Sequence, residues 1–322
     1  MQTRQLGTTG IYISPIGLGC WQFSKARGIA GGFWGDLDDA TIREIIRLSL
    51  EGGINWFDTA EAYGNGASEQ ALARALTDLG KAPGEVVIAT KWQPVFRFAR
   101  SITATIDERL AMLAPYPIDL YQVHNPFSFS GTTSQMNGMA DLLDAGKVRA
   151  VGVSNFSASL MRKAAAELEK RGYRLASNQV KYSLLDRDIE YNGVLETARE
   201  LGITIIAYSP LEQGILTGKF HEDPDLIQRT PGYRRFFSAF KPERLKRSEP
   251  LIRALQAIGE RYNATAAQVA LNWVINAHGE TVVAIPGATK PPQAEQNAAV
   301  MRFTLTRDEI DHLDSLSRVV TA

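Results

Sequence analysis

The segment GINWFDTAEAYGNGASEQALARALTDL, residues 53–79, contains one complete unit of the predicted fold. Its apolar run Ile54–Phe57 predicts a short buried strand, and the polar and glycine residues that follow predict a loop. Glu69–Leu79 then spaces its apolar side chains along one face of a helix. The order of strand, loop and helix recurs along the rest of the chain, and this recurrence decides the fold.

Short apolar runs alternate with helical patterns from end to end. The predicted strands are Ile16–Gly19, Ile54–Phe57, Val86–Thr90, Leu120–His124, Ala150–Val153, Ser177–Val180, Thr204–Tyr208 and Val282–Ile285. The predicted helices are Thr41–Glu51, Glu69–Leu79, Ile102–Leu113, Gln135–Ala145, Ser157–Lys170, Glu190–Leu201, Ala266–Ala277 and Pro292–Met301. Such strands pair in parallel through right-handed crossovers, and eight units close into an α/β fold, the (β/α)8 TIM barrel. An open doubly wound sheet is the alternative, but the first strand lacks the G-x-G-x-x-G turn typical of it.

Two segments stand outside the eight units. Arg4–Leu6 and Tyr12–Ser14, joined across Gly7–Gly10, predict an N-terminal β-hairpin that caps the bottom of the barrel. Leu211–Lys246 is longer than a routine connection and predicts a long functional loop at the C-terminal face. No long linker divides the chain, so residues 1–322 are expected to form a single domain.

The composition is that of an ordinary globular protein. Of 322 residues, 44% are hydrophobic and 22% charged, and the formal net charge is zero. Neutrality argues against general attraction to nucleic acid or to anionic membranes. The only cysteine is Cys20, residues 1–14 do not read as a signal peptide, and no apolar run reaches about 18 residues. We therefore expect a cytoplasmic enzyme with no membrane or nucleic-acid partner and no metal site, and leave its oligomeric state open.

Ionisable and polar side chains gather where the early strands end. Asp58 follows strand two, Lys91 follows strand three, His124 ends strand four, and Tyr63 lies in the loop just after Asp58. Each alone has a structural interpretation, as a turn cap, an exposed strand end, a hydrogen-bonded histidine or a loop aromatic. In a barrel, however, the carboxyl ends of adjacent strands share one mouth, and catalytic groups come from there. The four are therefore expected to converge.

These four side chains suit the reduction of a carbonyl. Hydride addition places negative charge on the carbonyl oxygen, which then needs a proton. Tyr63 can supply it if its pKa, ordinarily about 10, is lowered by the nearby Lys91 ammonium. Asp58 can hold Lys91 charged and oriented, and His124 can donate a hydrogen bond that fixes the carbonyl oxygen.

Several motifs carry a resemblance to a known family. The segment Gly53–Glu69, the pair Lys91–Trp92 and YQVHNP at 121–126 resemble the aldo-keto reductase superfamily, from LGTTG at 6–10 to EQN at 295–297. The pattern is similar to a bacterial branch and to potassium-channel β-subunits. The resemblance implies that Tyr63 is the proton donor and that the other three residues assist it, as above.

The same resemblance implies a nicotinamide cofactor. Ser154, Asn155 and Gln179 correspond to residues that bond the nicotinamide carboxamide, and Tyr208 to an aromatic that stacks on the ring. Stacking would leave one ring face open and so set the stereochemistry of transfer.

Later segments correspond to the phosphate and adenosine sites. Backbone amides of Ser209, Leu211 and Gly214 are expected to cradle pyrophosphate, with Lys219 as a charge partner; a flexible loop with a solvated lysine is the alternative. The resemblance implies adenosine contacts from Gly287, Thr289, Lys290, Gln293, Gln296 and Asn297. Well-known members carry lysine where Gly287 stands and arginine where Gln293 stands, whereas related bacterial and channel-associated members have this glycine and glutamine. The resemblance therefore still implies NADPH, with Lys290 at the 2′-phosphate, and NADH use stays open.

Aromatic residues follow several strands and predict an apolar or aromatic carbonyl substrate. The predicted substrate pocket comprises Trp21, Trp92, Phe96, Phe127 and Phe129, and Trp34 lies in a nearby glycine-rich loop. A basic segment contains Arg229, Arg234, Arg235, Lys241, Arg244, Lys246 and Arg247. It is interpreted as a loop that closes over the phosphates, with a nucleic-acid patch as the alternative.

Three functions are compatible with these patterns. The first is an NADP(H)-dependent reductase of aldehydes or ketones, which the complete set of four residues favours. The second is an NADPH-binding regulatory subunit with little turnover. The third is a barrel isomerase or aldolase that uses no nicotinamide.

Overall fold

The computed structural model describes residues 3–25, 35–229 and 240–321, and its centre is a parallel sheet of eight strands. In sheet order these are β3 (Leu18–Gly19), β4 (Trp56–Asp58), β5 (Val87–Trp92), β6 (Ile118–Val123), β7 (Val148–Ser154), β8 (Leu175–Lys181), β9 (Thr204–Tyr208) and β10 (Val282–Ala284). The two edges also meet, because Ile16 pairs with Ala284 and Gly19 with Gly287. The predicted α/β barrel is confirmed.

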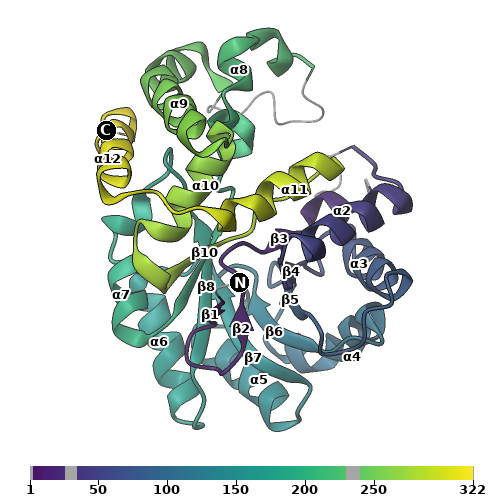
Figure 1. The fold of residues 1–322 in the computed structure, drawn as a ribbon. Coiled ribbons are helices and arrows are strands. Elements are labelled where there is room, and N and C mark those ends of the chain that lie inside the picture. Colours follow the sequence, from purple (N-terminus) through teal and green to yellow (C-terminus); the bar gives the residue numbers. More distant parts are fainter. Residues whose placement is uncertain (1–2, 26–34, 230–239, 322) are drawn as a thin grey trace.

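Helices surround the sheet on its outer side (Figure 1). Those between or after the strands are α2 (Asp39–Glu51), α3 (Ala67–Asp78), α4 (Arg100–Leu113), α5 (Thr132–Asp144), α6 (Ala158–Glu169), α7 (Val194–Leu201), α10 (Ala266–Asn276) and α11 (Pro291–Ala299). Most bounds lie within three residues of the predicted ones. The start of α7 was predicted at Glu190, which is wrong, because Glu190 belongs to the 3-10 turn η2 (Asp188–Glu190) and α7 begins only after its N-cap Gly193, which has a φ of 82°.

The N-terminal hairpin closes the bottom of the barrel, as predicted. Its strands are β1 (Arg4–Gln5) and β2 (Tyr12–Ile13). Apolar side chains of the hairpin join the cluster inside the barrel, which comprises Leu6, Ile11, Ile13, Trp56, Ala89, Leu120, Ala150, Ala176, Ile206, Val283 and Ile285. Arg4 Nη1 donates to the carbonyl of Val282 at 2.6 Å, at the start of β10. The open end of the barrel is therefore the carboxyl end of its strands.

The segment after β9 contains helices that were not predicted. Leu211–Lys246 is not one loop: it holds η3 (Glu212–Thr217), α8 (Lys219–Glu222), η4 (Pro224–Ile227) and the start of α9 (Pro242–Tyr262). Prolines were taken as loop signals, yet Pro242 occupies the first turn of α9, where the missing N–H costs nothing. Trp34, Arg234 and Arg235 lie outside the described residues.

The last helix, α12 (Arg307–Thr321), was also missed. Its sequence signal is the capping box TRDE at 306–309, since Glu309 N–H donates to Thr306 Oγ1 and Thr306 N–H donates to Glu309 Oε2. No helix in the described part of the chain is both long and apolar enough for a membrane span.

Arg187 fastens α12 to the turn after β8. Its guanidinium, 1% exposed, donates to both carboxylate oxygens of Glu190, at 2.9 and 2.6 Å, and to the carboxylate of Asp314 in α12. It also lies 5.0 Å from the ring centre of Trp273 in α10. Although burial raises the pKa of Glu190, hydrogen bonds from His278 and Arg187 lower it to about 2.

Replacing Arg187 by methionine is expected to lower the free energy of unfolding by about 3 kcal/mol, because two carboxylates would lose their buried counter-charge. The matched control is Arg318→Met, which removes an exposed i,i+4 partner of the same Asp314 and should cost under about 1 kcal/mol. Denaturant unfolding of both variants measures the difference. Equal stability of Arg187→Met and wild type would contradict the proposed link between α12 and the turn after β8.

Candidate active site

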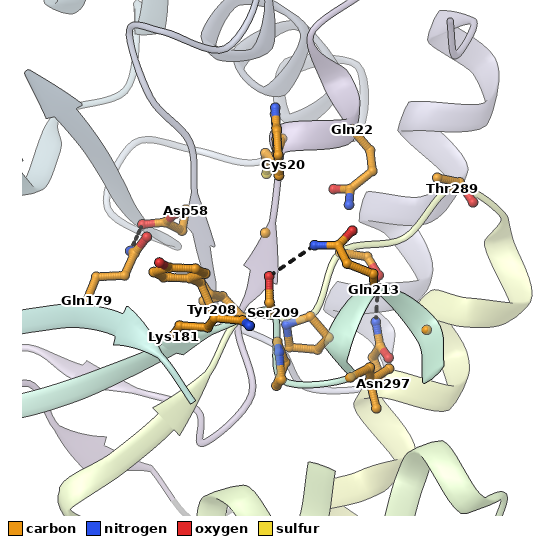
Figure 2. Close-up of a pocket in the computed structure, with 18 of the residues that line it drawn as sticks. Cys20, Gln22, Asp58, Gln179, Lys181, Tyr208, Ser209, Gln213, Thr289 and Asn297 are labelled. Carbon is orange, nitrogen blue, oxygen red and sulfur yellow. Dashed lines mark hydrogen bonds between the residues drawn. The ribbon is translucent and has the colours of Figure 1, made fainter. Parts of the chain in front are cut away.

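A cavity of about 670 Å³ lies at the carboxyl ends of the strands. It is lined by sixteen of the residues predicted for catalysis or cofactor binding: Asp58, Tyr63, His124, Ser154, Asn155, Gln179, Tyr208, Ser209, Leu211, Gly214, Lys219, Gly287, Thr289, Gln293, Gln296 and Asn297. Figure 2 shows Asp58 and Gln179 at one side of this space and Thr289 and Asn297 at the other. One continuous cavity therefore joins the residues predicted for catalysis with those predicted for cofactor binding.

Asp58 and Lys91 form a buried ion pair between the neighbouring strands β4 and β5. Lys91 lies inside β5, which runs to Trp92, rather than after the strand as predicted, and Asp58 ends β4. Lys91 Nζ donates to Asp58 Oδ1 at 2.5 Å and to the carbonyl of Thr59 at 2.8 Å, and neither residue is more than 1% exposed. Although burial lowers the pKa of Lys91, the carboxylate of Asp58 and the phenol of Tyr63 outweigh it and raise the pKa. Lys91 therefore stays a cation.

Two amides complete the shell of Asp58. Gln122 Nε2 donates to Asp58 Oδ2 at 3.1 Å, and Gln179 Nε2 donates to the same oxygen at 2.9 Å. Gln179, the predicted nicotinamide partner, thus also holds the carboxylate of Asp58. Gln122, inside β6 and fully buried, was not predicted.

Tyr63 lies between Trp21, His124 and Lys91. Its ring stacks on that of Trp21 with centres 6.0 Å apart, meets His124 edge-on at 5.8 Å, and has Lys91 Nζ 5.0 Å from its centre. Desolvation raises the pKa of the Tyr63 phenol, and the pull of Lys91 in the opposite direction is smaller. The expected lowering of this pKa is therefore not found, and the phenol carries its proton at neutral pH.

His124 directly follows β6, which ends at Val123, and was predicted to lie inside the strand. Burial, aided by the positive charge of Lys91, lowers the pKa of its imidazole to about 3. Nδ1 is buried and has no hydrogen-bond partner among the described residues. The imidazole is therefore neutral and offers one N–H donor to the cavity.

We expect the His124 ring to show no titration between pH ~5 and ~8, the range in which an ordinary histidine changes charge. With its pKa lowered to about 3, protonation begins only below that range. NMR of the ring protons, assigned by comparison with His124→Gln, measures this. A midpoint of about 6.5, the ordinary value, would contradict the burial described above.

The ends of β7, β8 and β9 form a connected polar wall. Ser154 Oγ donates to the carbonyl of Gln179 at 2.9 Å, Asn155 Nδ2 donates to Ser154 Oγ at 3.1 Å, and the Tyr208 hydroxyl donates to Asn155 Oδ1 at 3.0 Å. Asn155 has a φ of 59°. The four residues predicted to face the nicotinamide are thus brought together and hold one another in place.

The segment Ser209–Gly214 has an unusual backbone. Positive φ angles occur at Ser209 (50°), Glu212 (44°), Gln213 (56°) and Gly214 (94°). Such angles are costly for side chains other than glycine and occur mostly at functional sites. Two of its N–H groups are used within the turn, because Glu212 N–H donates to the carbonyl of Ser209 and Gly214 N–H donates to the carbonyl of Leu211, both at 2.9 Å. The Gly214 amide that was predicted to cradle pyrophosphate is therefore already bonded.

The side chain of Gln22 fills the space that a side chain at position 287 would need. A Cβ atom at position 287 would lie 2.2 Å from Gln22 Nε2, so glycine makes room for this amide. Gln22 is buried and points toward Gln213 in Figure 2, and its Oε1 has no partner in the part of the chain that the structure describes. Buried polar atoms are normally hydrogen-bonded, so Gln22 Oε1 is available to accept a hydrogen bond from a molecule bound in the cavity.

Most of the predicted substrate-pocket residues do not line the cavity. Trp21 lines the cavity. Trp92 is instead fully buried in the larger hydrophobic core, and its Nε1 donates to Ser101 Oγ at 3.0 Å. Phe96, Phe127 and Phe129 are exposed, with 82%, 75% and 60% of their surfaces accessible.

Lys290 is exposed at the N-cap of α11 and does not line the cavity either. Its neighbour Gln293 lines the cavity and accepts through Oε1 from the backbone N–H of Thr289 at 2.7 Å. Lining residues that were not predicted include Cys20, Gln22, Gln93, Lys181, Gln213 and Thr217. The described residues contain no cluster suited to holding a metal ion.

Comparisons with known proteins agree along the whole chain. The model of the "Aldo/keto reductase family" matches residues 15–318. An uncharacterised oxidoreductase of Mycobacterium tuberculosis (strain H37Rv) is 40% identical over 319 residues, 98% of this chain and 93% of that protein. An aldo-keto reductase of Bacillus subtilis is 33% identical over 330 residues, again 98% and 93%. The solved structure of a glycerol dehydrogenase from Gluconobacter oxydans has a TM-score of 0.83 and 27% identity, covering 99% of this chain and 96% of its own. The chain therefore belongs to the aldo/keto reductase family.

Proposed function

We propose that the protein reduces aldehydes or ketones to alcohols, with Tyr63 as the proton donor and NADPH as the source of hydride. The observation that carries this proposal is the phenol of Tyr63 between a buried Lys91–Asp58 pair and a neutral His124, in the cavity at the carboxyl ends of the strands. The bound cofactor would supply hydride from nicotinamide C4, and the chain supplies the proton.

Each catalytic side chain has a separate task. Tyr63 keeps its proton at neutral pH because its pKa is raised by desolvation, so it is a donor rather than a base. Negative charge that develops on the substrate oxygen is stabilised by the adjacent Lys91 cation, and transfer of the proton becomes easier as that charge grows. Asp58 keeps Lys91 in place, and the neutral His124 donates a hydrogen bond to the same oxygen.

The cavity residues fit a nicotinamide cofactor. Ser154, Asn155 and Gln179 would hold the carboxamide, with Tyr208 against the ring. The Ser209–Gly214 segment, which lines the cavity, would lie against the phosphates, and the unpaired Gln22 Oε1 would accept from a ribose hydroxyl.

We further propose that Lys290 favours NADPH by binding its 2′-phosphate from the rim of the cavity. Lys290→Met should then raise the KM for NADPH about tenfold, since a hydrogen-bonded charge pair is worth about 1.5 kcal/mol, and leave the KM for NADH nearly unchanged. Steady-state kinetics with both cofactors measure this. A wild-type preference for NADH, or an equal change with both cofactors, would contradict the assignment.

The proposed substrate is an apolar or aromatic carbonyl compound. Trp21 lines the cavity and offers an aromatic surface beside Tyr63. An apolar group bound there would be removed from water at about 25 cal/mol per Å².

Turnover with a panel of aldehydes, ketones and sugars tests the proposed function. Loss of nicotinamide absorbance with at least one aldehyde or ketone is expected, and the alcohol product should be identified. Cofactor that binds without being oxidised by any member of the panel would favour a regulatory subunit. Absence of cofactor binding would favour an isomerase or aldolase.

A further inference from the structure

Lys181 links two segments at the mouth of the barrel. It is the last residue of β8, lines the cavity, and lies beside its register partner Tyr208 (Figure 2). Its Nζ lies 2.9 Å from Glu212 Oε1 and 2.9 Å from Asp186 Oδ2. Glu212 belongs to the Ser209–Gly214 segment, whereas Asp186 belongs to the turn after β8. The ammonium thus joins the strand that supplies Gln179 to the segment with the unusual backbone.

The Lys181–Glu212 pair is shielded from solvent on one side. Glu212 is 8% exposed, and its second oxygen, Oε2, is buried with no hydrogen-bond partner among the described residues. Lys181 Nζ donates a hydrogen bond to Glu212 Oε1, and this carboxylate is mostly removed from water. The ion pair therefore fixes the position of Glu212 more firmly than an exposed ion pair would.

The conformation of the segment needs such a restraint. Ser209, Glu212 and Gln213 all have positive φ, and each such residue costs on the order of 1 kcal/mol or more. Residues of this kind stay in place only where surrounding contacts hold them. Two local hydrogen bonds contribute, from Glu212 N–H to the carbonyl of Ser209 at 2.9 Å and from Gln213 Nε2 to Ser209 Oγ at 3.3 Å. Lys181 adds a restraint from the barrel itself.

We propose that Lys181 is a positioning residue whose ion pair with Glu212 latches Ser209–Gly214 onto β8 and thereby sets how fast the nicotinamide cofactor leaves. This inference rests on the proposed function, since it takes the segment to hold the cofactor phosphates. Breaking the pair would free the segment to leave its left-handed conformation, and the contacts that its cavity-lining residues would make with the phosphates would be lost with it.

Two single variants separate the latch from simple electrostatics. Lys181→Met removes a cation near the cofactor, whereas Glu212→Gln removes an anion and keeps the side-chain shape. If charge alone acted on the cofactor phosphates, the first change would weaken binding and the second would strengthen it. The latch predicts that both variants release NADPH about tenfold faster than wild type, because both break the same hydrogen-bonded ion pair.

Three further variants complete the experiment, read out as NADPH dissociation rates by stopped-flow fluorescence. Lys181→Arg keeps the charge and should stay within about threefold of wild type. Asp186→Asn removes the other partner of Lys181 but not the latch, and should do the same. The exchange Lys181→Glu with Glu212→Lys, made together with Asp186→Asn so that the new glutamate faces no second carboxylate, should slow release again relative to either single variant.

The outcomes are distinct. Faster release in both single variants, with recovery in the exchange variant, supports the latch. Wild-type release rates in both, or changes in opposite directions, overturn it while leaving the reductase function standing. Failure of the wild-type protein to bind either nicotinamide cofactor would instead overturn the proposed function itself.

Discussion

Replacing Tyr63 by phenylalanine is expected to lower kcat by about a hundredfold or more, because the variant keeps the ring but loses the transferable proton. Its stacking on Trp21 and its edge contact with His124 involve the ring alone, so these contacts should persist. Cofactor affinity should therefore change little. Steady-state kinetics together with a cofactor titration measure both quantities.

The matched control is Tyr121→Phe. Tyr121 is fully buried in β6, and its hydroxyl has no hydrogen-bond partner in the described part of the chain. Loss of this hydroxyl should leave kcat close to wild type. Near-wild-type turnover of Tyr63→Phe would rule out Tyr63 as the proton donor.

Replacing Lys91 by methionine is expected to remove both activity and stability. The substitution leaves the carboxylate of Asp58 buried without its counter-ion, which costs about 3–5 kcal/mol. The amides of Gln122 and Gln179 still donate to Asp58, so the lower end of that range applies. Denaturant unfolding and kinetics on the same sample measure the two losses.

The double variant Lys91→Met with Asp58→Asn separates the two effects. With both charges removed, most of the lost stability should return, because no unpaired charge remains buried. Activity should not return, since the cation beside Tyr63 is still missing. Recovery of turnover in the double variant would contradict the role proposed for Lys91.

The barrel could be predicted because most of its strands are short apolar runs, whereas helix α9 could not be predicted and helix α12 was overlooked. Strands such as Thr204–Tyr208 are buried on both faces, so their own apolar sequence predicts them without knowledge of the neighbouring strands. In α9, Pro242 and Pro250 resemble loop signals, and only their positions in the folded helix make them tolerable. For α12 the signal was present, in the TRDE capping box.

Strand alternation explains part of what was missed at the site. Consecutive residues of a strand point to opposite faces, so Lys91 inside the barrel places Trp92 outside it. By the same rule Lys181 shares a face with Gln179, two residues before it, and could have been predicted to line the cavity. Gln22 had no such signal, because its position depends on the space left by the distant Gly287.

The pKa values of Tyr63 and His124 could not be predicted from the positions of charged residues in the sequence. The sequence places Lys91 near Tyr63 and suggests a lowered phenol pKa, but the extent of burial depends on the packed cavity and reverses the sign. For His124 the same desolvation lowers the pKa to about 3 and makes the ring a neutral donor.

In the proposed reaction, hydride passes directly from nicotinamide C4 to a carbonyl carbon in this cavity. Incubation with NADPH deuterated at the transferred C4 position, together with a reducible aldehyde, tests it most directly. The alcohol should carry one deuterium on the former carbonyl carbon, with the proton on oxygen taken from the protein and solvent. Alcohol without deuterium, from either face of the labelled cofactor, would contradict it.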